Sequence, residues 1–210
     1  MPQSSQEITE FVVKTIADTA LENEKYFCEL DGVVGDGDFG YSLGRGFEKV
    51  LAEWDTLDHT SPGGLLKKVA MVITSRVGGV SGTIWGTAFL RAGMVAGTKT
   101  DLTNEDIIAM FRSAIEGMKK RGETDLGDKT LLDALIPAVD KLEESFKEGK
   151  TGAAALKEAA VVARQSAEAT RPMIAKKGRA AYTGERSIGT LDAGAVAIAV
   201  LFETVSQVWQ

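Results

Sequence analysis

The stretch IIAMFRSAIEGM, residues 107–118, decides the fold class. Its apolar side chains recur every three or four positions, which is the spacing of a helix with one buried face. Residues 8–19 and 65–73 repeat that period, and the apolar–polar alternation of a half-buried strand is almost absent from the chain. We therefore predict an all-α protein.

Capping residues and glycines divide this pattern into helices. Residues typical of helix starts are Ser61-Pro62, Thr103–Asp106, Asp128 and Thr151. Glycines that close periodic runs are Gly97, Gly122, Gly149 and Gly178. The predicted helices span residues 5–28, 40–55, 62–76, 82–97, 103–120, 128–147, 151–176 and 190–208. Because the connections are short, successive helices should run antiparallel, which gives an eight-helix antiparallel bundle in one domain over residues 1–210.

The composition argues against several classes of function. The chain carries 24 Lys and Arg against 30 Asp and Glu, and its net charge is −6. Binding to nucleic acid or to a membrane surface needs clustered cations, so we expect neither. A single cysteine, Cys28, excludes an internal disulfide, and a single histidine, His59, disfavours a histidine-based zinc site. The start of the chain lacks a signal-peptide pattern, so we expect a cytoplasmic protein.

Four links between the predicted helices are rich in glycine and polar residues. They are residues 31–42, 78–82, 122–130 and 178–194. They follow the first, third, fifth and seventh predicted helices. In an antiparallel bundle these links share one end, so a site formed by loops at that end is expected.

The first link reads DGVVGDGDFGYS and fits several known loops only in part. A dinucleotide loop would point Asp36 and Asp38 at a pyrophosphate, and no strand–helix–strand unit surrounds it. A protein kinase would need a lysine-bearing strand and a catalytic loop that the chain lacks. A calcium loop starting at Asp36 would need oxygen ligands where Gly40 and Phe47 stand.

Three carboxylates remain in this link: Asp31, Asp36 and Asp38. Carboxylates crowded into a tight turn do not all ionise unless a cation lies among them. Mg²⁺ suits hard oxygen ligands and leaves coordination positions for phosphate oxygens. The alternative is that Asp36 and Asp38 are only turn and cap residues before the next helix, and the link by itself leaves both interpretations open.

Two other links favour phosphate chemistry. Residues 78–82, GGVSG, lead into a helix, and free amides at a helix start bind phosphate. The fourth link contributes Lys176, Lys177, Arg179 and Arg186 from its start and interior. Plain helix caps and dipole complements would explain the same residues. Metal-binding carboxylates, a phosphate loop and arginine at one end favour a nucleotide–Mg²⁺ site.

With these motifs together, the chain resembles the DhaL family, the nucleotide-binding subunits of bacterial dihydroxyacetone kinase, over nearly all of its length. The resemblance rests on Leu30-Asp31-x4-Asp36-Gly-Asp38-x-Gly40, Arg45-Gly46-Phe47, Gly78-Gly79-Val80-Ser81-Gly82, Gly127-Asp-Lys-Thr130 and Lys177-Gly178-Arg179-Ala-Ala-Tyr-x-Gly184-Glu-Arg-Ser-Ile-Gly189. It implies an eight-helix barrel with ADP or ATP at one end.

The resemblance also implies the site residues. Two Mg²⁺ ions would be held by Asp31, Asp36 and Asp38, and no protein nucleophile would be needed. Val80 and Ser81 would contact phosphate. The remaining residues implied to bind the nucleotide are Phe39, Gly40, Tyr41, Ser42, Gly79, Gly122, Thr130, Leu131, Arg179, Asp192, Ala193 and Gly194.

The family resemblance further implies partners. The sugar, a short-chain ketose, would bind to a separate DhaK-type subunit, so this chain would act as a kinase only with that subunit. A DhaM-type phosphocarrier would rephosphorylate bound ADP in one version, and ATP would be an exchangeable substrate in the other. A homodimer is compatible with both versions.

Two positions depart from the family pattern. Phe39 stands where the family usually has histidine, and Ala193 stands where it tends to have proline. Phenylalanine cannot donate a hydrogen bond to phosphate. Two alternative functions follow: a catalytically weak regulatory module that docks on a partner protein, and a binder of small apolar molecules.

Overall fold

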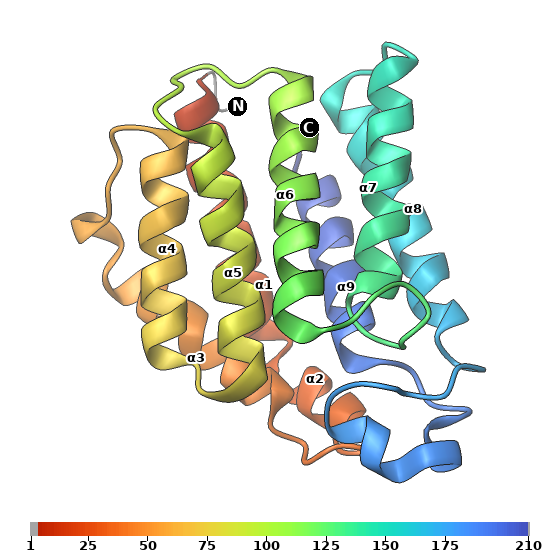
Figure 1. Cartoon of the computed structure of the whole chain (residues 1–210). Coiled ribbons are helices and arrows are strands. Elements are labelled where there is room, and N and C mark those ends of the chain that lie inside the picture. Colours follow the sequence, from red (N-terminus) through yellow and green to blue (C-terminus); the bar gives the residue numbers. More distant parts are fainter. Residues whose placement is uncertain (1–3, 210) are drawn as a thin grey trace. The chain divides into compact units, whose positions relative to one another are not determined.

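The computed structural model describes residues 4–209, apart from the Val80 side chain. Within that range the chain forms nine α-helices and two 3-10 helices and no strand (Figure 1). The all-α prediction is confirmed. None of the helices in the described range combines the length and the apolar content that crossing a bilayer requires.

The chain divides into two compact units. Unit 1 comprises the chain up to residue 21 together with residues 42–122, and unit 2 comprises residues 22–41 together with residues from 123 onward. Each unit is therefore assembled from two separated pieces of sequence. The division into units does not test whether residues 1–210 form one domain, so that expectation stays a prediction.

Unit 1 contains most of the N-terminal helices. They are α1 (Ser5–Glu22), the part of α3 (Phe39–Ala52) that follows Tyr41, η1 (Trp54–Thr56), α4 (Pro62–Arg76), α5 (Gly79–Ala96) and α6 (Asn104–Gly122). Helix α5 packs between α4 and α6. The backbones of α4 and α5 come so close that a Cβ on Gly63 would lie 2.2 Å from the Gly97 carbonyl oxygen. Small residues are thus required where these helices meet.

The predicted helix starts in unit 1 are confirmed by their hydrogen bonds. Ser61 Oγ accepts from the Gly64 amide at 3.1 Å, with Pro62 in the first turn of α4. Thr103 and Asp106 form a reciprocal capping box: the Thr103 amide donates to Asp106 Oδ2 at 3.1 Å, and the Asp106 amide donates to Thr103 Oγ1 at 3.2 Å.

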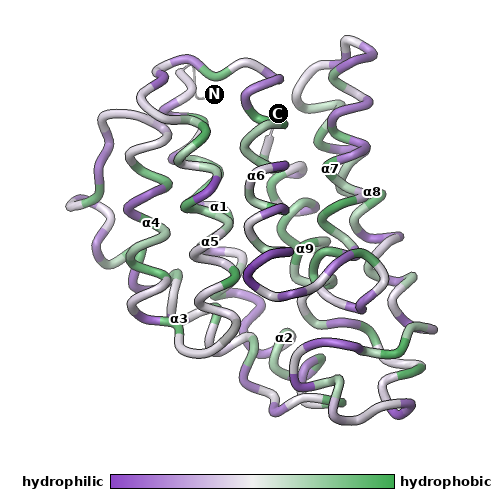
Figure 2. Tube along the Cα trace, viewed as in Figure 1, coloured by the Kyte–Doolittle hydropathy of each residue, from purple (hydrophilic) through white to green (hydrophobic). Residues whose placement is uncertain are grey.

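Unit 2 contains the remaining helices. They are α2 (Glu24–Asp31), α7 (Leu132–Lys147), α8 (Gly152–Ala169), η2 (Arg179–Ser187) and α9 (Ala193–Val208). Helix α8 buries a row of alanines, which lets α7 and α9 pack closely against it. Figure 2 shows the hydrophobic residues along α8 and α9 that form this core. Helix α2 packs against α9.

Three of the helix boundaries that the structure corrects have a clear physical cause. The predicted helix over residues 5–28 is two helices, because Asn23 has φ −102° and ψ 9° and interrupts the α-helical geometry. Helix α8 ends at Ala169 rather than near 176, because Pro172 disfavours helical geometry in the residue before it. Helix α7 begins at Leu132 rather than at 128, because Lys129 adopts a left-handed conformation with φ 60°.

Candidate functional site

Three aspartates come together at the junction of α2 and α3 in unit 2. Asp31 is the last residue of α2, while Asp36 and Asp38 lie in the turn before α3. One carboxylate oxygen from each of the three lies within 4.8 Å of the others. Asp31 is partly buried, and Asp36 and Asp38 are exposed. The geometry places three hard oxygen ligands around one point that solvent can reach.

Backbone amides hold the Asp31 carboxylate in place. Its Oδ2 accepts from the Gly37 amide at 2.9 Å and from the Asp38 amide at 3.2 Å. A Cβ on Gly35 would lie 2.3 Å from Asp31 Oδ1, and Gly37 has φ 74°. The turn can close over Asp31 only because these two positions are glycine.

The start of α3 is fixed against α2. A Cβ on Gly40 would lie 2.0 Å from the Glu24 carbonyl oxygen, so only glycine fits there. The Tyr41 amide donates to Cys28 Sγ at 3.2 Å. The ring of Phe39 packs against Phe27, with the centroids 6.1 Å apart. Phe39 therefore stabilises the packing of the first turn of α3 on α2.

The charges of the cluster are unbalanced. Burial raises the pKa of the Asp38 carboxyl above its usual value, and the neighbouring carboxylates of Asp36 and Asp31 raise it further. Arg179 acts in the opposite direction, and its Nε lies 3.0 Å from Asp36 Oδ2. One guanidinium faces three carboxylates, so the cluster suits a multivalent cation.

A second loop, residues 123–131, is organised by a buried carboxylate. Asp133 is 3% exposed, and it accepts from the Gly127 amide at 2.6 Å and from the Thr130 amide at 2.7 Å. The prediction that Asp128 caps the following helix is wrong. Asp128 instead accepts from the Asp125 amide at 2.9 Å, inside the loop.

Lys129 lies at the centre of this loop and is 2% exposed. Its ammonium donates to the main-chain carbonyls of Met173 at 3.1 Å, Ser187 at 2.6 Å and Thr190 at 2.8 Å. We call residues 173–190, which include η2, the strap. Burial lowers the pKa of the Lys129 ammonium below its usual value, and the Asp192 carboxylate works against that shift.

Asp192 links the strap to α9. Its Oδ2 accepts from the Ala195 amide at 2.7 Å and caps the helix, and its own amide donates to Thr170 Oγ1 at 3.1 Å. The residue keeps some access to solvent, but protein atoms enclose the carboxylate and raise its pKa to about 7. Helix α9 begins regularly at Ala193, where a proline would also fit. A Cβ on Gly194 would lie 3.0 Å from Leu131 Cβ.

Unit 2 thus brings together parts of three of the four predicted links. The Arg179–Asp36 ion pair joins the strap to the first link, and Lys129 joins the strap to the third. The predicted site residues in unit 2 are Asp31, Asp36, Asp38, Phe39, Gly40, Tyr41, Thr130, Leu131, Arg179, Asp192, Ala193 and Gly194. Their contacts with a nucleotide stay predictions.

The other predicted site residues lie in unit 1. They are Ser42, Gly79, Val80, Ser81 and Gly122. Helix α5 begins at Gly79 with φ 67°, three residues earlier than predicted, and its N-cap Gly78 has no side chain to accept from the first-turn amides. Helix-start amides of this kind are suited to a phosphate. Gly122 is the last residue of α6.

Sequence reasoning missed the roles of Lys129 and Asp133. Lys129 is part of the Gly127–Thr130 motif, and Asp133 lies three residues after it. Charged residues in a polar loop give no sign of burial, however, and nothing local marks Lys129 as left-handed. The burial of both residues is apparent only in the folded chain, and so are the hydrogen bonds from Lys129 to three carbonyls.

A family model described as the DAK2 domain matches residues 33–207. The chain belongs to this family. The matched range contains the strap, the loop at 123–131, and Asp36 and Asp38. Asp31 lies just before it.

Individual relatives support the assignment. The chain is 37% identical over 182 residues to the PEP-dependent dihydroxyacetone kinase, ADP-binding subunit DhaL, of Escherichia coli K12, and the match covers 87% of each protein. It is 35% identical over 196 residues to an L-erythrulose kinase of Pectobacterium atrosepticum, covering 91% of this chain and 33% of the relative.

A solved structure has the same fold. The dihydroxyacetone kinase of C. freundii, in complex with AMP-PNP and Mg²⁺, superposes with a TM-score of 0.74 and 24% identity. The match covers 99% of this chain and 34% of the kinase. The helical fold predicted from the sequence is therefore one that a known kinase contains.

Proposed function

We propose that this chain is the nucleotide-binding subunit of a kinase for dihydroxyacetone or a related short-chain ketose. One observation carries the proposal: three aspartate carboxylates converge within 4.8 Å beside Arg179, in a chain of the DAK2 family. The similar E. coli protein is named as an ADP-binding subunit. The proposed function explains why the structure gathers negative charge without an equal number of fixed cations.

The three aspartates fit Mg²⁺. They supply hard oxygen ligands, and the exposure of Asp36 and Asp38 leaves coordination positions open to phosphate oxygens. We propose that Asp31, Asp36 and Asp38 hold two Mg²⁺ ions. Bound there, the metal would supply the positive charge that neutralises the nucleotide phosphates during transfer.

The chain's own residues would bind and orient the nucleotide. The strap carries four cationic residues, Lys176, Lys177, Arg179 and Arg186, against one acidic residue, Glu185. Arg179 already reaches the aspartate cluster and is placed to contact the phosphates. No side chain need form a covalent intermediate, because the terminal phosphoryl group passes in line to a hydroxyl of the sugar.

The sugar would bind to a DhaK-type partner, and its identity rests on that partner. The relatives include enzymes named for dihydroxyacetone and for L-erythrulose. The likeness to a PEP-dependent enzyme favours retained ADP that a DhaM-type phosphocarrier rephosphorylates, over exchangeable ATP. On this proposal the protein works in the cytoplasm, where both nucleotides are available. Light scattering on the purified protein tests for a homodimer.

A regulatory module is the second candidate function, and Phe39 favours it. Its ring packs on Phe27 and offers phosphate no hydrogen bond. Such a module would bind nucleotide without supporting transfer. A coupled assay with a DhaK-type subunit separates the two functions: turnover supports the kinase subunit, and nucleotide binding without turnover supports the module.

The direct test is the nucleotide content of the purified protein after long dialysis with and without EDTA. Stoichiometric ADP that leaves only with EDTA would support the three-aspartate site and the retained-ADP version. Reversible binding of ATP with Mg²⁺ would support the exchangeable version. No binding of either nucleotide, with Mg²⁺ present, would overturn the proposed function.

A further inference from the structure

We propose that Lys129 is a positioning residue for the nucleotide site: by fastening both ends of the strap, it holds Arg179 beside Asp36. The inference rests on the proposed function for its consequence and on the contacts of Lys129 for its mechanism. Lys129 itself would not touch the nucleotide.

The three acceptors of the Lys129 ammonium lie at the two ends of the strap. Met173 is its first residue, and Ser187 and Thr190 are near or at its end. An ammonium has three N–H donors, and three main-chain carbonyls take them up. A single side chain thus closes a loop of the main chain, with η2 and Arg179 on the closed segment.

The conformation of Lys129 is maintained by its surroundings. A φ of 60° is unfavourable for a residue with a side chain. Asp133 fixes the amides of Gly127 and Thr130 on either side of it. Backbone strain that the surrounding structure holds in place is common at functional sites. The strain here directs the ammonium under the strap rather than toward solvent.

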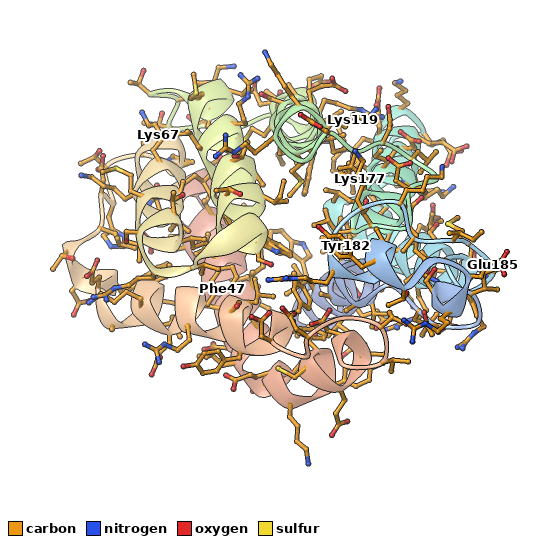
Figure 3. The ribbon with its side chains drawn as sticks, turned by 60° about the horizontal axis from the view of Figure 1, so that its bottom comes forward. Phe47, Lys67, Lys119, Lys177, Tyr182 and Glu185 are labelled. Atoms are coloured by element: carbon orange, nitrogen blue, oxygen red, sulfur yellow. The ribbon has the colours of Figure 1, made fainter. Side chains whose placement is uncertain are left out.

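Other contacts also hold the strap. The Lys176 amide donates to the Asp128 carbonyl at 3.1 Å, the Lys176 ammonium lies 3.2 Å from Asp128 Oδ1, and the Arg171 guanidinium donates to the Gly189 carbonyl at 3.0 Å. The Ala175 amide donates to Ser187 Oγ at 2.9 Å, and the Gly189 amide donates to the Arg171 carbonyl at 2.8 Å. Between its ends, Gly184 has φ 57° and Tyr182 is 87% exposed. Figure 3 shows Lys177, Tyr182 and Glu185 along this segment. Without Lys129 the strap would keep these contacts but lose the clasp, by which we mean the three hydrogen bonds that one buried ammonium makes to its two ends.

Arg179 depends on the strap for its position. It is 71% exposed in its side chain, and its ion pair with Asp36 is made from the first residue of η2. An exposed ion pair is weak by itself, so it does not hold the strap. We therefore infer that Lys129 holds the strap, and that the strap in turn sets the position of Arg179.

A double-mutant cycle tests this dependence. The affinity for ADP with Mg²⁺ is measured by calorimetry for wild type, Lys129→Met, Arg179→Ala and the double variant. We expect each single variant to bind about tenfold or more weakly, and the double variant to be within about twofold of Arg179→Ala. Independent effects that multiply in the double variant would overturn the proposal.

Two matched variants separate positioning from charge. Lys147→Met removes an exposed cation of α7 that pairs with Glu143 outside the strap, and it should change affinity less than Lys129→Met does. Lys129→Arg keeps the charge, but its planar fork cannot direct three donors from one nitrogen. It should give an intermediate affinity. Equal losses in Lys147→Met and Lys129→Met would assign the effect to net charge and refute the clasp.

Hydrogen exchange measured by mass spectrometry provides the second readout and does not require nucleotide. Strap amides should exchange faster in Lys129→Met than in wild type, whereas Arg179→Ala should leave them nearly unchanged. If Lys129→Met does not fold, the same comparison is made with Lys129→Arg. Unchanged strap exchange in the folded Lys129 variant would refute the clasp.

The two proposals fail in distinguishable ways. If the wild type binds neither ADP nor ATP with Mg²⁺, the proposed function is refuted together with the nucleotide role of Lys129, and the exchange data still decide whether Lys129 holds the strap. If the wild type binds nucleotide and the cycle is multiplicative, only the positioning role is refuted.

Discussion

Unit 2 contains two clusters of charged side chains that differ in how their charges are balanced. At the turn between α7 and α8, Lys150 Nζ lies 2.6 Å from Glu158 Oε1 and 2.7 Å from Glu148 Oε2. Ser145 Oγ also donates to Glu158 at 2.7 Å. At the junction of α2 and α3, three carboxylates share one guanidinium.

The pKa shifts have opposite directions in the two clusters. Hydrogen bonds from Lys150 and Ser145 lower the pKa of the Glu158 carboxyl to about 2. Burial and the neighbouring carboxylates raise the pKa of Asp38. The first cluster is satisfied by its own residues, and the second is not. Perturbed carboxylates without enough protein cations are characteristic of functional sites, which supports the proposal that the second cluster, and not the first, binds a ligand.

We expect the largest effect from Asp36→Asn, which removes one carboxylate of the unbalanced cluster. Loss of a proposed direct ligand should weaken Mg²⁺-dependent nucleotide binding by more than about 100-fold, since even residues behind metal ligands contribute 10–100-fold. Because the substitution also removes like-charge repulsion, the Tm without metal should not fall. Calorimetry and thermal melts measure both quantities. Glu158→Gln is the matched control, and a similar loss of binding in that variant would contradict the contrast.

Asp192→Asn tests an enclosed carboxylate outside both clusters by a measurement of stability. The pKa of Asp192 is about 7 in the folded protein, against an ordinary value of 3.8, so the folded state binds this proton more tightly. Wild-type stability relative to the variant should therefore fall as pH rises from about 4 to 7 and stay constant above. Because Asp192 keeps some access to solvent, we expect the two free energies of unfolding to differ by on the order of 1–4 kcal/mol at pH 8.

Denaturant unfolding at a series of pH values measures this difference. Asparagine also caps helices well, so α9 should keep its start. Subtracting the two pH curves removes the contribution of all other titrating groups. A wild type that gains stability over the variant between pH 4 and 7 would contradict the enclosed position of the carboxylate.

Glu158→Gln is expected to act in the opposite way to Asp36→Asn. It removes the acceptor charge of Lys150, so the Tm should fall, and nucleotide binding should be unchanged. Salt screens exposed pairs, so the Tm difference should shrink as NaCl is raised. Melting curves at low and high salt measure it. A rise in Tm would show that this cluster is not self-sufficient.

The smallest expected effect concerns His59 in unit 1, which has one carboxylate and one carbonyl as its partners. Its Nδ1 lies 2.8 Å from Glu10 Oε1 and its Nε2 lies 2.8 Å from the Trp54 carbonyl oxygen. These contacts raise the pKa of His59, with the Trp54 carbonyl the largest cause, while burial and the Lys14 ammonium oppose the shift. The stability they provide is complete below about pH 6.5 and is lost as pH rises through the higher folded pKa.

Because His59 is the only histidine, its ring gives a single set of NMR signals to titrate. We expect a pKa above 6.5 in wild type and a lower one in Glu10→Gln. The Trp54 carbonyl contact should remain in that variant. A wild-type pKa below 6.5 would mean that desolvation outweighs both acceptors.

The three-aspartate cluster could be predicted because it is local. Asp31, Asp36 and Asp38 lie within eight consecutive residues, and the glycines between them permit a tight turn. Helix class and the caps at Ser61 and Thr103 are local for the same reason. Carboxylate spacing and side-chain capping are properties of a few consecutive residues.

The strap and its clasp could not be predicted, because they depend on distant partners. The carbonyls that Lys129 contacts lie 44, 58 and 61 residues along the chain. Main-chain carbonyls are present at every residue, so no side-chain pattern marks these three. The end of α8 was predictable in principle, since Pro172 disfavours helical geometry before it.

The two-piece construction of unit 2 affects how the protein is made. The segment carrying the three aspartates is synthesised before residues 42–122 of unit 1, and these in turn precede the loop, the strap and α9. Domains tend to fold as they emerge, so unit 1 can be complete while the aspartates still lack Arg179. The residues proposed to hold the metal are translated well before Arg179, the partner that they contact in the folded unit.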